Sequence, residues 1–186
     1  MQRRSSDAQL KAMAAQWPDF SGRKLADGTL VWAGPLRPKA RFYTVSVIWK
    51  PAAMSLPYVM IDDPPLEPRP GGTFAEIPHL IFYAEKPEQS GLCLFDPDGK
   101  EWTPADLIAV TTLPWTAEWL AYYELWHLTG DWLAPGVGYE SVARMHAAEA
   151  RTVKEILLMF TDRRANSLAT RRVRQPWPKD KPFRNL

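Results

Sequence analysis

Hydrophobic and polar positions alternate most clearly between Arg41 and Trp49. One face of this segment is apolar and the other is polar: Tyr43, Val45, Val47 and Trp49 against Thr44 and Ser46. A period of two among β-branched and aromatic residues predicts a half-buried strand. Shorter apolar runs predict strands over residues 29–33, which we expect Gly34-Pro35 to end, and over residues 58–61.

The next segment predicts less regular structure. Residues 64–72 contain four prolines and two glycines, which indicates an irregular loop. Residues 74–83 have a mixed pattern with Pro78-His79 in the middle. Together with the preceding strands, this favours a meander of short antiparallel strands.

Helical spacing appears first in residues 6–17, where four hydrophobic positions recur every three or four residues: Leu10, Met13, Ala14 and Trp17. Ser6 or Asp7 can cap this helix, and Pro18 ends it. We expect the helix to pack one face on the sheet.

The second half of the chain also predicts helices. Thr103 as N-cap and Pro104 at the first helical position indicate a short helix over residues 103–112. A second helix runs from Pro114 to Gly130 and carries an aromatic stripe, most of it expected in the core: Trp115, Trp119, Tyr122, Tyr123 and Trp126. A third is predicted over residues 140–166, with a buried side of six residues: Val142, Met145, Val153, Ile156, Leu157 and Phe160.

A helix, then strands, then helices indicate an α+β fold with an antiparallel sheet. We predict one domain over residues 1–170 and a basic, proline-containing tail over residues 171–186. The net charge is only +2, but residues 163–186 hold eight of the 23 basic residues. Such a tail can contact nucleic-acid phosphates, although a solvated tail or one that contacts an acidic partner fits equally well.

Cys93 is the only cysteine, which excludes an intramolecular disulfide and a multi-cysteine metal site and fits a reducing, cytoplasmic location. No signal peptide or membrane-spanning run is expected. The thiolate is the reactive form of cysteine, and His79 upstream is a possible partner for nucleophilic catalysis. A lone cysteine between leucines is more often buried and inert.

Three segments together carry a resemblance: Pro78-His79, Gly91-Leu92-Cys93-Leu94 and Trp102-Thr103-Pro104-Ala105. This order resembles the active-site region of ubiquitin-conjugating enzymes. With residues 114–120 and 129–132, it is similar more narrowly to bacterial conjugating-enzyme-like proteins of cyclic-oligonucleotide-based anti-phage signalling (CBASS) systems. The resemblance implies a UBC-like fold with an N-terminal helix, an antiparallel strand meander, an active-site flap and C-terminal helices.

The resemblance also implies a chemistry and a set of partners. Cys93 would carry an acyl group as a thioester, and His79 would orient the flap through a backbone carbonyl. The acyl group would be the C-terminus of a cyclic-oligonucleotide synthase (CD-NTase-like), loaded with the help of an activating enzyme and passed to an amine. No metal or organic cofactor is implied, and three scattered histidines with one cysteine do not make a zinc site.

The sequence departs from the ubiquitin-conjugating enzymes at the residues after the histidine. Leu80-Ile81 stands where the family has Pro-Asn, and the asparagine is thought to stabilise the oxyanion. Candidate replacements are backbone amides or one of three side chains: Asp98, His127 and Asn166. Asp131 and Glu140 can lower the pKa of an incoming lysine, or they can be plain loop acids.

Two other interpretations stay open. The chain can be a non-catalytic UBC-fold binding module that scaffolds the synthase or another partner, with Cys93 as a relic. It can also be a small nucleic-acid-binding protein that uses its basic tail.

Overall fold

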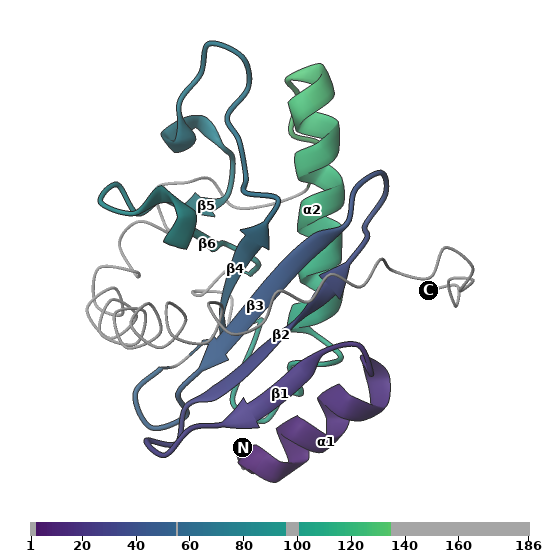
Figure 1. The fold of residues 1–186 in the computed structure, drawn as a ribbon, viewed down its shortest axis with the longest axis vertical. Coiled ribbons are helices and arrows are strands. Elements are labelled where there is room, and N and C mark those ends of the chain that lie inside the picture. The colour runs from purple at the N-terminus through teal and green to yellow at the C-terminus, as the bar shows by residue number, and fades with distance from the viewer. Residues whose placement is uncertain (1–2, 55, 96–100, 135–186) are drawn as a thin grey trace, which may run out of the picture. The chain divides into compact units, whose positions relative to one another are not determined.

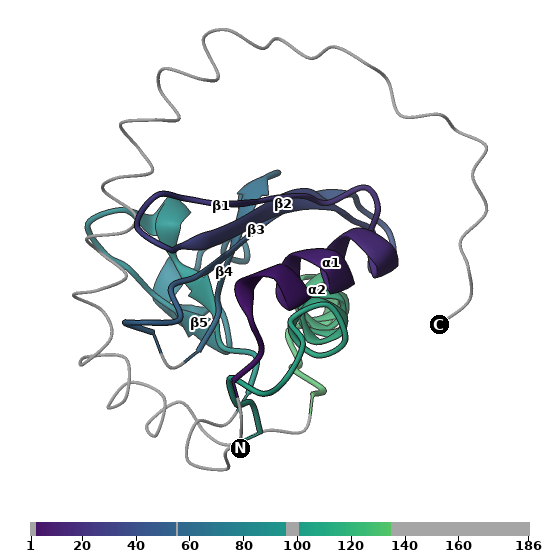
Figure 2. The same ribbon diagram turned by 90° about the horizontal axis from the view of Figure 1, so that it is seen from below.

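A six-stranded antiparallel sheet lies at the centre of the structure, with the strand order β1-β2-β3-β4-β6-β5 (Figure 1). The structure is a computed structural model, and it describes residues 3–54, 56–95 and 101–134, all within a compact unit that spans Met1–Val153. Helices α1 and α2 lie on the same side of the sheet (Figure 2). The strands are β1 Ser21–Lys24, β2 Leu30–Leu36, β3 Tyr43–Trp49, β4 Tyr58–Asp63, β5 Leu80–Ile81 and β6 Gly91–Leu92. The helices are α1 Ser6–Gln16 and α2 Thr112–Thr129, with short 3-10 turns η1 Phe74–Glu76 and η2 Pro87–Gln89.

Strand β3 forms where its sequence predicts it, but it is buried on both faces rather than half-buried: Ser46, on the face expected to be polar, is only 4% exposed, and Ile48 is 2% exposed. Val45, Val47 and Trp49 are fully buried, whereas Thr44 is exposed. The indole of Trp49 meets the ring of Trp102 edge to face, with centroids 5.3 Å apart. This contact joins the sheet to the segment between Cys93 and α2, so the core extends to the candidate site.

The expectation that Gly34-Pro35 ends a strand at residue 33 is wrong. Strand β2 continues to Leu36, and Pro35 lies opposite Thr44 of β3. Strand β1 ends its pairing at Ala33, so the last residues of β2 are paired on one side only. Proline, which lacks a backbone N–H, is tolerated at such an edge.

Helix α1 matches the prediction in place but differs in its cap and its buried face. Ser5, rather than Ser6 or Asp7, is the N-cap, and its hydroxyl accepts a hydrogen bond from the Ala8 N–H at 3.2 Å. The buried residues of the helix are Gln9 and Met13, whereas Ala14 is exposed. A polar side chain therefore occupies a core position that the hydrophobic spacing does not indicate.

The helix predicted over residues 103–112 does not form. The segment is a series of turns, and Thr103 with Asp106 closes one of them through side-chain hydrogen bonds. Backbone groups of residues 105–109 bond instead to three side chains of the N-terminal segment: Arg4, Gln9 and Trp17. Because these bonds satisfy the backbone, helical pairing is not needed there. Helix α2 then begins at Thr112, and Gly130 ends it with a left-handed φ of 92°.

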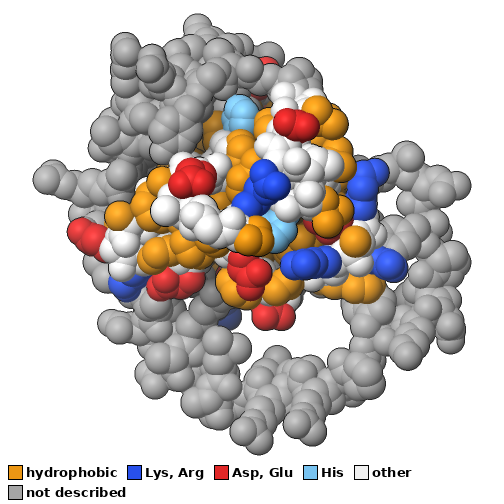
Figure 3. Space-filling model, turned by 90° about the horizontal axis from the view of Figure 1, so that it is seen from above, with side chains coloured by type: hydrophobic (Ala, Val, Ile, Leu, Met, Phe, Trp, Pro, Cys, Tyr) orange, Lys and Arg blue, Asp and Glu red, His pale blue; other side chains and the backbone are white. Residues whose placement is uncertain are grey.

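Hydrophobic side chains occupy much of the face seen from the end at which α2 and β4 terminate, with acidic and basic groups scattered between them (Figure 3). Large hydrophobic residues that are exposed in the described part of the chain are Phe42, Val110, Leu128 and Leu133. No helix among the described residues is long and apolar enough to cross a membrane.

The helix predicted over residues 140–166 and the basic tail over residues 171–186 lie outside the described residues. The boundaries of the predicted domain, 1–170, and a nucleic-acid role for the tail therefore stay predictions.

Candidate functional site around Cys93

Strand β6 places Cys93 beside residues 78–81, which include β5 and correspond to the active-site flap that the resemblance implies; this segment is called the flap below. Gly91 pairs with Met60 of β4 and with Ile81 of β5, and Leu92 pairs with Leu80. A Cβ on Gly91 would overlap the ring of Tyr58, so only glycine allows β6 to lie this close to β4. The Tyr58 hydroxyl also donates to the Gln89 carbonyl at 2.9 Å, which fixes the chain just before Cys93.

The backbone carbonyl of His79 joins three elements of the site. It accepts the backbone N–H of Cys93 at 2.9 Å and the indole N–H of Trp119 at 3.2 Å. His79 itself has a φ of 53°, an uncommon left-handed conformation for a residue other than glycine. This geometry turns the carbonyl toward both donors, so the flap, the cysteine and α2 are held at one atom.

The Cys93 side chain is partly accessible. Its residue is half-buried, and the sulfur lies 3.9 Å from the Phe95 carbonyl, within reach of a weak S–H hydrogen bond. The ring of Phe95 meets Trp115 at the beginning of α2, with centroids 5.6 Å apart. The backbone before and after the thiol is therefore fixed by contacts with other elements, while the Cys93 residue stays partly exposed.

The imidazole of His79 packs on the indole of Trp132, with ring centroids 5.4 Å apart and an angle of 29° between the planes. Trp132 also contacts the rings of Trp119 and Tyr122 on α2. Partial burial lowers the pKa of His79 below its ordinary value, which favours the neutral form of the ring. A neutral, stacked imidazole positions its own backbone and adds no positive charge near the thiol.

Other candidate residues fall in different places. His127 lies in the last turn of α2, where its ring packs against Tyr123 and Trp126. Asp131 is exposed, and its N–H donates to the Thr129 hydroxyl at 3.1 Å. The remaining three lie outside the described residues: Asp98, Glu140 and Asn166. In the described ranges, no group of three His, Cys, Asp or Glu side chains could hold a metal ion.

The aromatic stripe of α2 is core for most of its length. Trp119, Tyr123 and Trp126 are buried, while Trp115 and Tyr122 are half-buried. The pattern does not reveal that two of these residues also have polar roles. Besides the Trp119 bond to the flap, the Tyr123 hydroxyl accepts the Glu67 N–H at 2.8 Å and donates to the Glu67 carbonyl at 2.9 Å. In the sequence, the only sign of such roles is that tryptophan carries an indole N–H and tyrosine a hydroxyl.

The order of elements and the position of Cys93 define the class. An N-terminal helix, an antiparallel meander, a flap that pairs with the cysteine strand and a following helix form an α+β, ubiquitin-conjugating-enzyme-like fold. The sequence profile of the family described as type II CBASS E2 protein matches residues 9–139, which is more than half of the chain. The protein belongs to this family, and it is thus a conjugating-enzyme-like component of bacterial CBASS anti-phage defence. No curated protein matches the chain significantly.

Proposed function

We propose that the protein is a cysteine-dependent acyl transferase in which Cys93 carries the acyl group as a thioester. The observation that supports this most directly is the anchoring of Cys93 through its own N–H to the His79 carbonyl, which Trp119 also binds. Positioning of a reactive group is a large part of catalysis in transfers of this kind. A half-buried thiol held at a fixed backbone position suits that task.

The proposed reaction has two exchanges. The Cys93 thiolate attacks the carbonyl carbon of a thioester on an activating enzyme, a new C–S bond forms, and the thiolate of that enzyme leaves. An amine then attacks the same carbonyl carbon, the bond to Cys93 breaks, and the amine proton passes to water or a nearby base. His79 positions Cys93 in both steps, while backbone amides or one of the candidate side chains stabilise the oxyanion.

In this proposal the acyl group is the C-terminus of a cyclic-oligonucleotide synthase. The test is co-expression with the synthase and the activating enzyme that are encoded beside this protein, followed by non-reducing gels and measurement of the intact mass. The wild type should form a thiol-sensitive adduct, Cys93→Ser a thiol-resistant ester, and Cys93→Ala none.

Absence of any adduct that depends on Cys93 would refute the transferase. If Cys93→Ala then still co-purified with the synthase, the alternative of a non-catalytic binding module would hold.

A further inference from the structure

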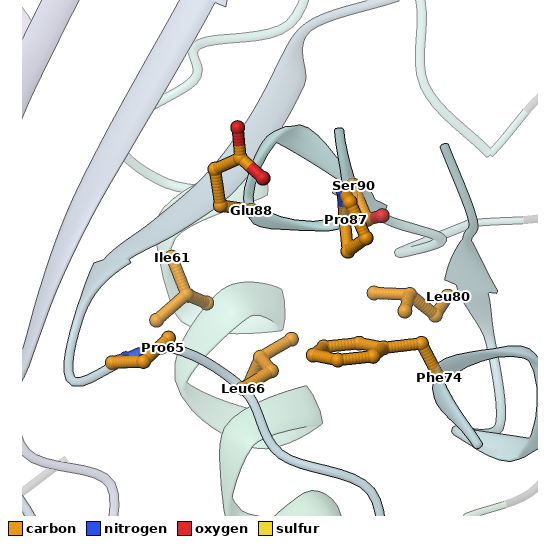
Figure 4. Close-up of a pocket in the computed structure, with 8 residues that line it drawn as sticks. All are labelled: Ile61, Pro65, Leu66, Phe74, Leu80, Pro87, Glu88 and Ser90. Carbon is orange, nitrogen blue, oxygen red and sulfur yellow. The ribbon is translucent and has the colours of Figure 1, made fainter. Parts of the chain in front are cut away.

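An apolar pocket lies beside the cysteine strand (Figure 4). Its volume is about 170 Å³. It is lined by Ile61 of β4, Pro65 and Leu66 of the following loop, Phe74 of η1, Leu80 of β5, and Pro87, Glu88 and Ser90 around η2. Hydrophobic side chains point into the space from several elements, and the Glu88 carboxylate stands at its edge (Figure 4).

The size and lining of the pocket define what it can bind. A cavity of about 150 Å³ lined by aliphatic and aromatic side chains holds a benzene ring. The pocket therefore has room for one large aliphatic or aromatic side chain. Leu66 and Leu80 form part of its wall and are buried in the core, so the wall is a fixed part of the fold.

The sequence around the pocket is acidic. Residues 61–90 contain six carboxylates and two cationic side chains, although the whole chain has a net charge of +2. Glu88 lines the pocket itself, and four further carboxylates lie within two residues of a lining residue: Asp63, Glu67, Glu76 and Glu85. The sixth, Asp62, bonds to the Ser46 hydroxyl of β3 at 2.6 Å. One of the two cations, Arg69, has its Nε atom buried against the end of α2. The other, Lys86, precedes the lining residue Pro87. The excess of carboxylates in this segment attracts a cationic partner and disfavours an anionic one.

The pocket is also close to the proposed reaction centre. Leu80 in its wall pairs with Leu92, the residue before Cys93. Ser90, also in the wall, precedes Cys93 by three residues, which is roughly 10 Å along an extended strand. An extended peptide advances about 3.3 Å per residue. Cys93 stands an odd number of residues after Ser90 and therefore faces the other side of the strand, but β5 is the last strand of the sheet. A peptide anchored in the pocket can thus present a lysine two or three residues away to the thioester by reaching around this edge.

We propose that this pocket binds a hydrophobic side chain of the acceptor, in a basic segment that places its lysine at Cys93. The inference rests on the proposed transferase and names the class of its second substrate. Charge decides between acceptor and donor, because the acceptor segment must contain a cationic lysine, whereas nothing in the chemistry requires positive charge on the acylated C-terminus.

The experiment uses fluorescent peptides on the full chain. The probe is acetyl-Arg-Leu-Gly-Lys-Arg-amide, with two control peptides in which Leu is replaced by Ser or Lys by Arg. With thioester-loaded wild type, acylation of the Leu peptide should exceed that of the Ser peptide by roughly tenfold to a hundredfold, the range for burial of one such side chain. The peptide without lysine should not be acylated. This comparison needs no variant of the protein.

Two variants locate the binding site. Phe74→Ala should remove most of the preference for Leu, whereas Phe42→Ala, at an exposed phenylalanine between β2 and β3, should retain it. Glu88→Lys should slow acylation of the basic peptide about two- to fivefold at low salt and less at high salt. Asp19→Lys makes the same charge change next to β1, at the opposite edge of the sheet, and should have no effect.

The outcomes separate this inference from the proposed function. Equal acylation of the Leu and Ser peptides by a loaded wild type would overturn the pocket assignment while leaving the transferase intact. Slower thioester formation in Phe74→Ala, with unchanged peptide transfer, would assign the pocket to the donor and overturn it as an acceptor site. If the wild type forms no thioester, the transferase fails. Fluorescence anisotropy with Cys93→Ala then decides the pocket alone: tighter binding of the Leu peptide supports it and equal binding refutes it.

Discussion

Replacement of Trp119 by phenylalanine tests whether the His79 carbonyl holds the cysteine in place. The substitution keeps an aromatic ring at a position that is only 5% exposed but removes the N–H that donates to this carbonyl at 3.2 Å. The bond from the Cys93 N–H stays possible, so the carbonyl loses one of its two donors. The flap should then be held to α2 less tightly.

The magnitude follows from two contributions. A net hydrogen bond between neutral groups contributes about 1 kcal/mol. The smaller ring adds a cavity cost that depends on how well the site collapses. Comparison with Trp126→Phe isolates the contribution of the hydrogen bond, because that control has only the cavity cost. Trp126 lies on the same helix, is 7% exposed, and donates no indole hydrogen bond within the described part of the chain.

The assay combines urea unfolding with hydrogen exchange of single amides. Both variants should unfold at lower urea than the wild type. At the Cys93 amide, Trp119→Phe should exchange about fivefold faster than Trp126→Phe after correction for global stability, which corresponds to about 1 kcal/mol of local opening. Amides in the middle of β3 should show no such difference.

Equal exchange of the Cys93 amide in the two variants would refute the reasoning. It would mean that the indole bond to the carbonyl contributes nothing to the position of the cysteine strand. Trp119 would then be a core residue only, as its helical spacing suggests.

Three further substitutions test other parts of the framework. His79→Asn should flatten the pH dependence of Tm, because partial burial lowers the pKa of the imidazole in the folded state. The lowered pKa gives full stability above pH ~6.5, which is lost as the pH falls below this value, and asparagine tolerates the φ of 53°. Gly130→Ala should lower the free energy of unfolding by about 1–2 kcal/mol because of the left-handed φ alone, and by more because its Cβ overlaps the Arg69 guanidinium. Urea unfolding of Gly130→Ala with and without Arg69→Ala separates the two causes, since Arg69→Ala relieves only the overlap. Gln9→Ala should cost about 2–4 kcal/mol in urea unfolding, because it leaves two backbone groups of residues 106–108 without their partner; a loss below about 1 kcal/mol would contradict this.

Elements with a strong local signal could be predicted from the sequence. The alternation along residues 43–49 corresponds to β3, and Gly130 ends α2 as expected. Strand β1 has no such signal, because its four residues are all exposed and form a strand only through pairing with β2. A short strand whose stability comes from its partner has no hydrophobic period of its own.

The segment between Cys93 and α2 shows the same limit from the other direction. Thr103 and Pro104 carry a genuine helix-start signal, and Thr103 does form the expected kind of local side-chain bonds. Yet residues some 100 positions earlier, above all Gln9, take the backbone groups that a helix would have used. Local propensity is a weak prior, and a buried tertiary partner overrides it.

The site divides in the same way. Cys93 and His79 could be selected from their motifs, because chemistry depends on residue type. The resemblance implies that His79 acts through a backbone carbonyl, but the two donors that the His79 carbonyl accepts could not be predicted, since they follow from a backbone angle and from the place where the Trp119 indole ends. The pocket could not be predicted from the sequence either, because its walls come from segments between residues 61 and 90 that meet only in the folded chain.

The departure from the family pattern and the pocket involve the same short strand. Leu80-Ile81 stands where the ubiquitin-conjugating enzymes that the sequence resembles have Pro-Asn, and here these two residues form β5 and pair with the cysteine strand. Leu80 is 2% exposed and lines the pocket. At this point of the flap, an apolar side chain of the pocket wall therefore takes the place of a polar one. In the proposed transferase, the oxyanion must then be stabilised from elsewhere, and the chain has an apolar surface near Cys93 instead of the side-chain amide. That exchange is what we expect if recognition of the acceptor, rather than an extra hydrogen-bond donor, governs which amine receives the acyl group.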